Sequence, residues 1–466
     1  MGVKGFNPNI MMNEGPMTVG IMSTVIEGGG SLDTAIRDVA KNGPALSSKL
    51  FKSVTVDADT RTTPDVKTGL TNALTTLPAG SASYRRAIHM VIAASESGDV
   101  LDKKRMLKDA SEISLNGLKE TGETYSSSLN GPCMVIFGLG IMVPMVLMSI
   151  LPLLNMGGMF GSSPFGSEPI VFITLVIVPC VIAALVISVK ERNPFLQYGG
   201  MKNGYKHILV LAMAIPMSVV LWNVMDDATI SIVISSSVVG TVSFVMLYPV
   251  MRNERIREKQ EQFLKDAVFE FGNRLLSGEN FETALVGSIR MRNECILIAE
   301  AVERELNICR GDVGSAIRMA IGPVSSRMAD IFCGVHKCSL KDMRDAGRLA
   351  ISVGRQLQDQ DTVRKAIQNK LKSMTDMMTG TAAVFAPLVL GMSIAMLEPI
   401  SKVMEGTDMG STSIILTIYL AELCVLMAIL TAYLGGRTGS RDIAYRIGMT
   451  LPLSMIVFLL CSNMGL

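Results

Sequence analysis

The sequence predicts an all-α, polytopic membrane protein with about seven transmembrane helices and two homologous cytoplasmic helical-bundle modules. Three observations lead to this class: a composition that is 49% hydrophobic and only 18% charged, several apolar stretches as long as a bilayer is thick, and an internal repeat. A mean hydropathy of +0.40 over 466 residues is too high for one soluble domain.

Seven apolar stretches are predicted to span a membrane. The hydrocarbon core is about 30 Å thick and a helix rises about 1.5 Å per residue, so a span needs about 20 mostly apolar residues. The stretches that approach this length are 132–154, 170–189, 208–224, 228–250, 381–397, 413–434 and 447–464. Only a few polar residues separate the third from the fourth, so we expect these two to form a tight hairpin.

Basic connections between the spans alternate with connections that hold almost no Lys or Arg. The basic ones lie at 190–206, 251–259 and 437–446. The other connections lie at 155–168, 223–227 and 398–412, and Lys402 is their single basic residue. Because basic connections stay in the cytoplasm, we expect a multi-pass protein of the cell membrane with a cytoplasmic N terminus and an external C terminus. The net charge of +2 gives no reason to expect a nucleic-acid partner.

This topology divides the chain into two hydrophilic and two apolar segments. The predicted domains are 1–130, the first cytoplasmic module; 131–250, four transmembrane helices with a short cytoplasmic loop at 190–207; 251–379, the second cytoplasmic module; and 380–466, three transmembrane helices.

The two hydrophilic segments repeat one pattern. In each copy a helix ends at a glycine turn, and a second helix begins with a capping residue, Ser31 or Asn280, followed by a carboxylate that favours the helix dipole. The apolar residues that follow form one stripe, which predicts an amphipathic helical hairpin. The repeated positions are Gly29, Leu32, Ala35, Ile36, Gly69, Ala73 and Gly98 in the first copy and Gly278, Phe281, Ala284, Gly311 and Ala316 in the second.

The repeat continues into the membrane, where Pro144 corresponds to Pro387. Both copies enter the membrane from the same side, so the repeat is parallel and not of the inverted kind found in many transporters. Between these anchors no single register holds, and one alignment matches Ala94 and Gly98 with Ala350 and Gly354. The charged stretches 99–123 and 356–378 are predicted to be helices that run into a span and couple each module to the membrane.

The repeated residues resemble the F domain of type II secretion systems. Two such domains with about seven spans resemble the platform proteins of archaeal archaella and type IV pili more than the bacterial platform, which has fewer spans. The resemblance covers most of the chain and rests on the order and duplication of small and apolar residues. The second copy has Glu279 where the first has Gly30.

This resemblance implies a membrane platform that is not an enzyme and needs no cofactor. It would bind a cytoplasmic hexameric secretion ATPase, pass pilin-like subunits into a growing filament, contact membrane lipids and form a homo-oligomer, expected to be a dimer. The rival class is a secondary transporter or channel, which should show several buried polar residues and broken helices at corresponding positions of its halves.

Two basic clusters and one acidic residue each have alternative interpretations from the residues alone, and two prolines are candidate hinges. Lys103, Lys104, Arg105 and Lys108, like Arg252, Arg255 and Arg257, form either a solvated helix face or a contact for the ATPase or for anionic lipid. Glu422, near the middle of a span, serves interhelical hydrogen bonding, subunit contact or an ion pathway. Pro144 and Pro387 remove a backbone hydrogen bond and are candidate hinges.

Two further patterns are weaker. The loop 28–30 opens a helix and offers amide groups to a phosphate, but it lacks the GxxxxGK[ST] pattern, so we interpret it as a structural turn. Cys333, His336 and Cys338 are soft ligands without a familiar metal-binding spacing, and we interpret them as helical packing with no metal site. We find no candidate catalytic residue.

Overall fold

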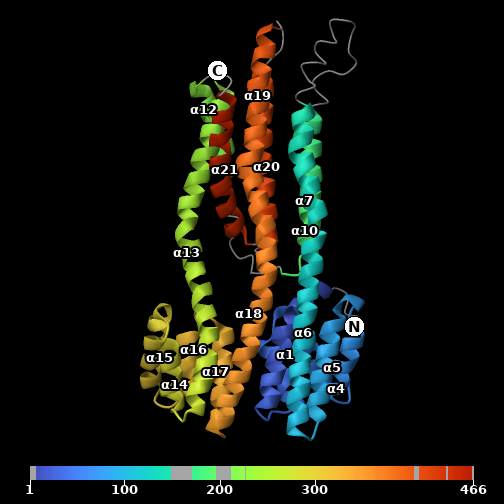
Figure 1. Cartoon of the computed structure of the whole chain (residues 1–466), viewed down its shortest axis with the longest axis vertical. Coiled ribbons are helices and arrows are strands. Elements are labelled where there is room, and N and C mark those ends of the chain that lie inside the picture. Colours follow the sequence, from blue (N-terminus) through green and yellow to red (C-terminus); the bar gives the residue numbers. More distant parts are fainter. Residues whose placement is uncertain are drawn as a thin grey trace. The chain divides into compact units, whose positions relative to one another are not determined.

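The computed structural model describes residues 7–147, 171–195, 211, 213–225, 227–403, 409–436 and 439–463. Within these ranges every regular element is a helix and none is a strand, which confirms the predicted all-α class (Figure 1). The predicted external loop at 155–168 lies outside the described residues.

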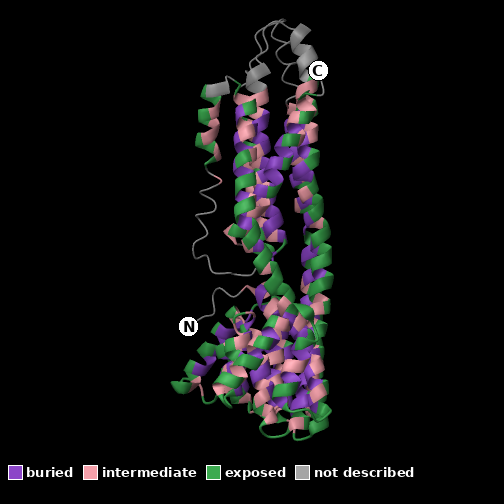
Figure 2. Cartoon of the chain, turned by 90° about the vertical axis from the view of Figure 1, so that its left-hand side faces the viewer, coloured by how far each residue is buried: buried purple, intermediate pink, exposed green. Residues whose placement is uncertain are grey.

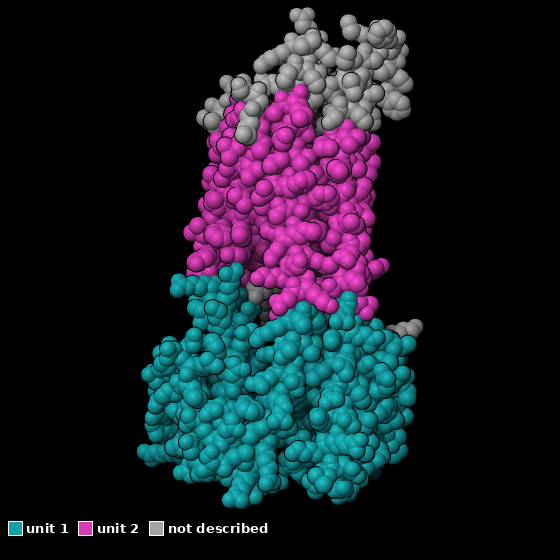
Figure 3. Space-filling view, in the orientation of Figure 1, with its two compact units in different colours: residues 1–123, 252–367 teal, residues 124–251, 368–466 magenta. Residues whose placement is uncertain are grey.

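The chain forms two compact units, each built from both halves of the sequence (Figure 3). Unit 1 comprises Met1–Glu123 and Arg252–Ile367, and unit 2 comprises Thr124–Met251 and Gln368–Leu466. Three helices contain residues of both units: α6 (Val100–Ser128), α13 (Ala228–Leu276) and α18 (Met343–Gly380).

The first half of unit 1 is a bundle of short helices. They are α1 (Pro8–Glu27), α2 (Leu32–Asn42), α3 (Ala45–Asp59), α4 (Val66–Thr75) and α5 (Ala82–Glu96), followed by the unit 1 part of α6. Side-chain caps fix two of the starts: Ser31 Oγ accepts from the Thr34 amide at 3.2 Å, and Asp65 Oδ1 accepts from the Thr68 amide at 2.8 Å.

The second half of unit 1 is also a bundle of short helices. Its helices are α14 (Phe281–Arg290), α15 (Ile296–Cys309), α16 (Val313–Ile321) and α17 (Ser326–Ser339), together with the unit 1 parts of α13 and α18. Asp312 caps α16 by accepting from the Ser315 amide at 3.0 Å. The left-handed backbone of Arg310 and Gly311 turns the chain between α15 and α16.

Each half of unit 1 has its own apolar core. Phe51 and Tyr84 are fully buried in the first, and Phe271 and Phe332 in the second. Among the repeated positions, Ala35, Ile36, Ala284 and Ala316 are fully buried, while Leu32 and Ala73 pack at the edge of the first core. Figure 2 shows the buried residues inside unit 1 and the exposed ones over its surface. The apolar stripes are therefore the faces on which the helices pack.

The two glycine turns have matching backbone geometry. Gly29 has a φ of 78° and Gly278 a φ of 90°, both in the left-handed region. The next amide donates back to Val25 at 2.8 Å in the first turn and to Arg274 at 3.2 Å in the second, which satisfies a carbonyl at the helix end. Only glycine adopts this φ without strain.

Unit 2 contains the apolar helices of a multi-pass membrane protein. Six helices in the described residues are long and apolar enough to cross a membrane: Val100–Leu147, Ile173–Arg192, Ala228–Leu276, Met343–Met396, Ser413–Leu434 and Ser440–Asn463. Large apolar side chains such as Met134, Val245 and Leu460 are at least 60% exposed on them, as expected for surfaces that face lipid.

The predicted span 208–224 is not among the six. Residues 208–210 and 212 lie outside the described residues, and Ala214–Asn223 forms only a shorter apolar helix within α12 (Ala214–Met225). The count of seven therefore stays a prediction.

Glycines allow close packing between the helices of unit 2. A Cβ on Gly391 of α19 (Ala386–Val403) would lie 2.8 Å from Cys461 Cβ on α21 (Ser440–Asn463). A Cβ on Gly448 of α21 would lie 2.9 Å from the Gly240 carbonyl of α13. Such small-residue contacts hold apolar helices together where lipid removes the hydrophobic driving force.

Candidate functional site

A groove of about 440 Å³ lies within unit 1, between its two halves. Helices α1 and α18 contribute mainly aliphatic side chains to its lining: Met17, Ile21, Val25, Leu349, Val353 and Leu357. The charged lining residues come from α2, from α17 and from the turn after α17: Arg37, Asp38, Lys41, Arg327, Asp330, Lys337 and Lys341. The groove thus joins an apolar surface to a predominantly basic one.

Polar contacts from α18 hold the two halves together beside this groove. Gln360 Nε2 donates to the Pro16 carbonyl of α1 at 2.9 Å, and Gln356 Nε2 donates to Ser111 Oγ of α6 at 3.2 Å. Gly20 permits the approach, since a Cβ there would lie 3.2 Å from Gln356 Nε2. The side chains of α18 therefore position α1 against the second half of unit 1.

Four of the five basic side chains that line the groove form no ion pair with a carboxylate of the described residues. Among the described residues, no ion pair within 4.0 Å involves Lys41, Arg327, Lys337 or Lys341. Arg327 donates to Gln360 Oε1 at 2.9 Å, a neutral partner. Burial lowers the pKa of Arg327, while the charges of Glu261 and Asp361 oppose this shift.

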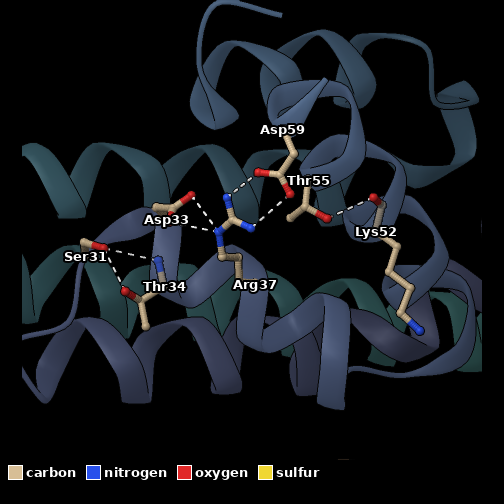
Figure 4. A network of polar contacts seen from close by, with 7 residues as sticks. All are labelled: Ser31, Asp33, Thr34, Arg37, Lys52, Thr55 and Asp59. Carbon is tan, nitrogen blue, oxygen red and sulfur yellow. Dashed lines mark hydrogen bonds and ion pairs between the residues drawn. The ribbon is translucent and has the colours of Figure 1, made fainter. Parts of the chain in front are cut away.

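The fifth basic side chain, Arg37, belongs to a surface network shown in Figure 4. It donates to Asp33, one helical turn earlier, at 3.1 Å and to Asp59 of α3 at 2.7 Å. Hydrogen bonding to Arg37 lowers the pKa of Asp59 below its ordinary value. This network fixes α2, which forms one wall of the groove, to α3.

The two acidic side chains of the groove come from opposite halves of unit 1. Asp38 accepts from Asn42 Nδ2 at 3.0 Å. Burial raises the pKa of Asp330, and the charge of Asp38 raises it further, while Arg318, Lys41 and Lys337 oppose the rise. The charge of Asp38 therefore influences the protonation of Asp330 across the groove.

The basic residues selected from the sequence lie elsewhere. Lys103, Lys104, Arg105 and Lys108 are in the first turns of α6, and Arg252, Arg255 and Arg257 are in the middle of α13. Apart from Lys103, which is half-buried, these side chains are exposed. None of the seven lines the groove, and no hydrogen bond or ion pair of the described residues joins the two clusters. Sequence reasoning missed the groove because its walls are far apart in the chain.

Glu27, at the end of α1, sits between the first cluster and α18. Burial raises the pKa of its carboxyl, whereas a hydrogen bond with Ser352 and the charge of Lys104 lower it. The charge of Lys104 therefore acts on a carboxyl group of unit 1.

The two prolines selected from the sequence follow π-helical turns in unit 2. Pro144 comes two residues after the π-helix Gly138–Met142, and Pro387 two residues after the π-helix Thr381–Phe385. Proline cannot donate to the carbonyl four residues earlier, and the wider turn accommodates its ring.

Helix α20 (Met409–Leu434) supplies a hydrogen-bond donor to a backbone carbonyl within each of these π-helices. Tyr419 Oη donates to the Gly140 carbonyl at 2.6 Å, and Cys424 Sγ donates to the Ala382 carbonyl at 3.6 Å. Glu422 lies between these two residues on α20, and its Oε2 is buried without a hydrogen-bond partner among the described residues.

The glycine loop and the cysteine cluster have local structural roles. The amides of Gly29 and Gly30 donate to carbonyls of α1, so they do not point freely toward a ligand. His336 packs against Phe281 with ring centroids 4.8 Å apart, and Cys333 Sγ donates to the Gly314 carbonyl. The described residues contain no group of three side chains arranged to hold a metal ion.

No family model matches the chain, and no curated protein or solved structure resembles it closely enough to count as a match.

Proposed function

We propose that the protein is the membrane platform of an archaeal type IV filament, either an archaellum, a pilus or a related secretion machine. One observation carries this proposal: a charged helix of each half of unit 1 is followed at once by apolar helix. Only Leu129 separates α6 from α7 (Asn130–Phe137), and α18 leads through the π-helix Thr381–Phe385 into α19. Helices joined this closely carry a displacement of the hydrophilic end toward the apolar end, which suits a part that transmits motion.

The duplicated features support the same proposal. Asp99 and Asp342 begin α6 and α18 alike, since each Oδ1 accepts from the amide two residues later, at 3.1 Å and 2.7 Å. Each of these helices then reaches a π-helical turn followed by a proline. Two similar halves of unit 1, both in the cytoplasm, would let one ATPase act on two helices that lead into the membrane.

In this proposal unit 1 lies in the cytoplasm and binds a hexameric secretion ATPase. Unit 2 lies in the cell membrane, with an external C terminus, and passes pilin-like subunits toward the filament. The chain acts as a homodimer and has no enzymatic activity. The exposed cations of α6 and α13 are the proposed contacts for the acidic surface of the ATPase or for anionic lipid.

The direct test is binding of the host's secretion ATPase to the full chain in lipid nanodiscs. We expect micromolar or tighter binding, weakened about 10-fold or more in the variant Arg105→Glu/Lys108→Glu, which reverses two exposed cations of α6. The matched control is Lys49→Glu/Lys52→Glu, which reverses two exposed cations of α3. No binding by the native chain would refute the proposed role, and equal losses in both variants would refute the proposed contact.

A transporter is the second candidate, because unit 2 holds a buried unpartnered carboxylate oxygen on Glu422 and wide turns at Pro144 and Pro387. Broken helices at corresponding positions beside an ionisable group are typical of transporters. Solute uptake by vesicles that contain only this protein, abolished by Glu422→Gln, would favour this candidate over the platform.

A further inference from the structure

We infer that the groove of unit 1 binds an acidic amphipathic helix of a protein partner, with an aliphatic face toward α1 and α18 and Asp or Glu side chains toward α2 and α17. This inference does not depend on the proposed platform function.

The extent of the groove matches a helix. Its lining runs along α1 from Met17 to Gly28 and along α17 from Arg327 to Cys338. At about 1.5 Å per residue, each stretch is about 16 Å long, which is three turns of helix. A lining that extends over three turns of two helices suits helix-in-groove recognition.

The lining chemistry selects the occupant's faces. Aliphatic side chains such as Ile21, Val353 and Leu357 offer an apolar surface. No aromatic residue is among the described residues that line the groove, so they offer a nucleobase no ring on which to stack. Within the described part of the chain, Lys41, Lys337 and Lys341 have no carboxylate partner within 4.0 Å. Acidic side chains beside an apolar stripe complement both surfaces.

Glycine leaves space in the wall. Gly334 lines the groove on α17, and a Cβ there would meet no heavy atom within 4 Å. This position can receive a side chain of the occupant, and a Cβ introduced there displaces no neighbour.

The test uses the full chain in nanodiscs of zwitterionic lipid and fluorescein-labelled 18-residue helices. The helices share one leucine stripe and carry Glu, Gln or Lys beside it. We expect the Glu helix to bind in the micromolar range, more weakly as salt increases, and the Lys helix to bind at least about 10-fold more weakly.

Two variants locate the bound helix. Gly334→Trp should weaken binding of the Glu helix about 10-fold or more, and Lys337→Glu/Lys341→Glu should shift the preference toward the Lys helix. The matched control is Gly98→Trp, because a Cβ at Gly98 also meets no atom within 4 Å and Gly98 does not line the groove. Circular dichroism and unfolding temperature identify any variant that misfolds.

Three results would overturn the inference. These are no binding of the Glu helix to the native chain at about 100 µM, equal binding of the Glu and Lys helices, or equal effects of Gly334→Trp and Gly98→Trp. Displacement of the helix by millimolar ATP would also overturn it, in favour of a site for a small anion.

Discussion

Two prolines and the donors of one helix define the most specific side-chain contacts of unit 2. Pro144 has no amide hydrogen for the Gly140 carbonyl, and Tyr419 of α20 donates to that carbonyl instead. An unpaired carbonyl is costly in an apolar environment, so the hydroxyl stabilises the wide turn. Proline and tyrosine are thus coupled although they lie on different helices.

Removing this hydroxyl should destabilise the protein only while the proline is present. We expect Tyr419→Phe to cost about 0.5–2 kcal/mol of unfolding free energy in detergent. In the background Pro144→Ala the cost should shrink, because residue 144 then has an amide to offer. A double-mutant cycle measured by denaturant unfolding checks the coupling, and additive costs would show that the two residues act independently.

Glu27 gives unit 1 a pH dependence whose sign follows from burial. Because its pKa is raised, the folded chain holds this proton to a higher pH than the unfolded chain does. The contribution of protonated Glu27 to the free energy of unfolding is complete at pH values below its ordinary pKa of 4.5. It is lost as the pH rises through the raised pKa of the folded chain. Glu27→Gln should therefore raise the unfolding temperature, by an amount that grows between about pH 4 and 7.

The control for this measurement is Glu112→Gln, which removes an exposed carboxylate of α6. It should show no gain that grows with pH. A gain from Glu27→Gln that stayed constant or fell with rising pH would mean that the attraction of Lys104 outweighs the burial of the carboxyl.

At the level of elements, the glycine turns fix where helices end. Gly29 and Gly278 have space for a Cβ but a φ that L-residues rarely adopt, so only the backbone opposes substitution. Gly29→Ala and Gly278→Ala should each cost about 1–2 kcal/mol. Gly98→Ala is the control, because it has the same open space without a positive φ, and it should be neutral. Equal effects at all three positions would contradict this explanation.

The pair α13 and α18 packs backbone against backbone. A Cβ on Gly272 would lie 2.8 Å from the Ile351 amide nitrogen, and one on Gly354 would lie 2.9 Å from Phe269 Cα. Gly272→Ala should therefore separate the two helices and cost about 1–3 kcal/mol. Gly334→Ala, on the open face of α17, should cost much less. Thermal unfolding of the two variants compares them, and similar costs would show that the contact is not tight.

Across the whole molecule, patterns local in sequence were predictable. Apolar residues at helical spacing predicted the all-α class, since such a stripe depends only on residues that are close together in the sequence. The spans were found for the same reason, except 208–224, of which the described residues form a shorter helix. No single register held between residues 87 and 130 of the first copy and the second copy, where Gly98 precedes α6 whereas Gly354 lies inside α18 and packs on α13.

The groove was not predictable. Arg327 and Lys337 are ordinary charged residues of one amphipathic helix, and Ile21 is one apolar residue of another. Their shared surface depends on how α18 holds α1 through Gln356 and Gln360, which no periodicity within either helix encodes.

We propose that α6 and α18 transmit motion between a cytoplasmic and a membrane unit, and interrupting these helices is the sharpest test of that role. A flexible Gly-Ser insertion after Glu123 or Ile367 falls at a unit boundary, while the same insertion after Arg61, in the exposed connection between α3 and α4, leaves both helices intact. Filaments are counted by electron microscopy in cells whose only copy carries each insertion. The account predicts filaments with the Arg61 insertion and none with the others, despite normal ATPase binding. Native filament numbers with both boundary insertions would contradict it.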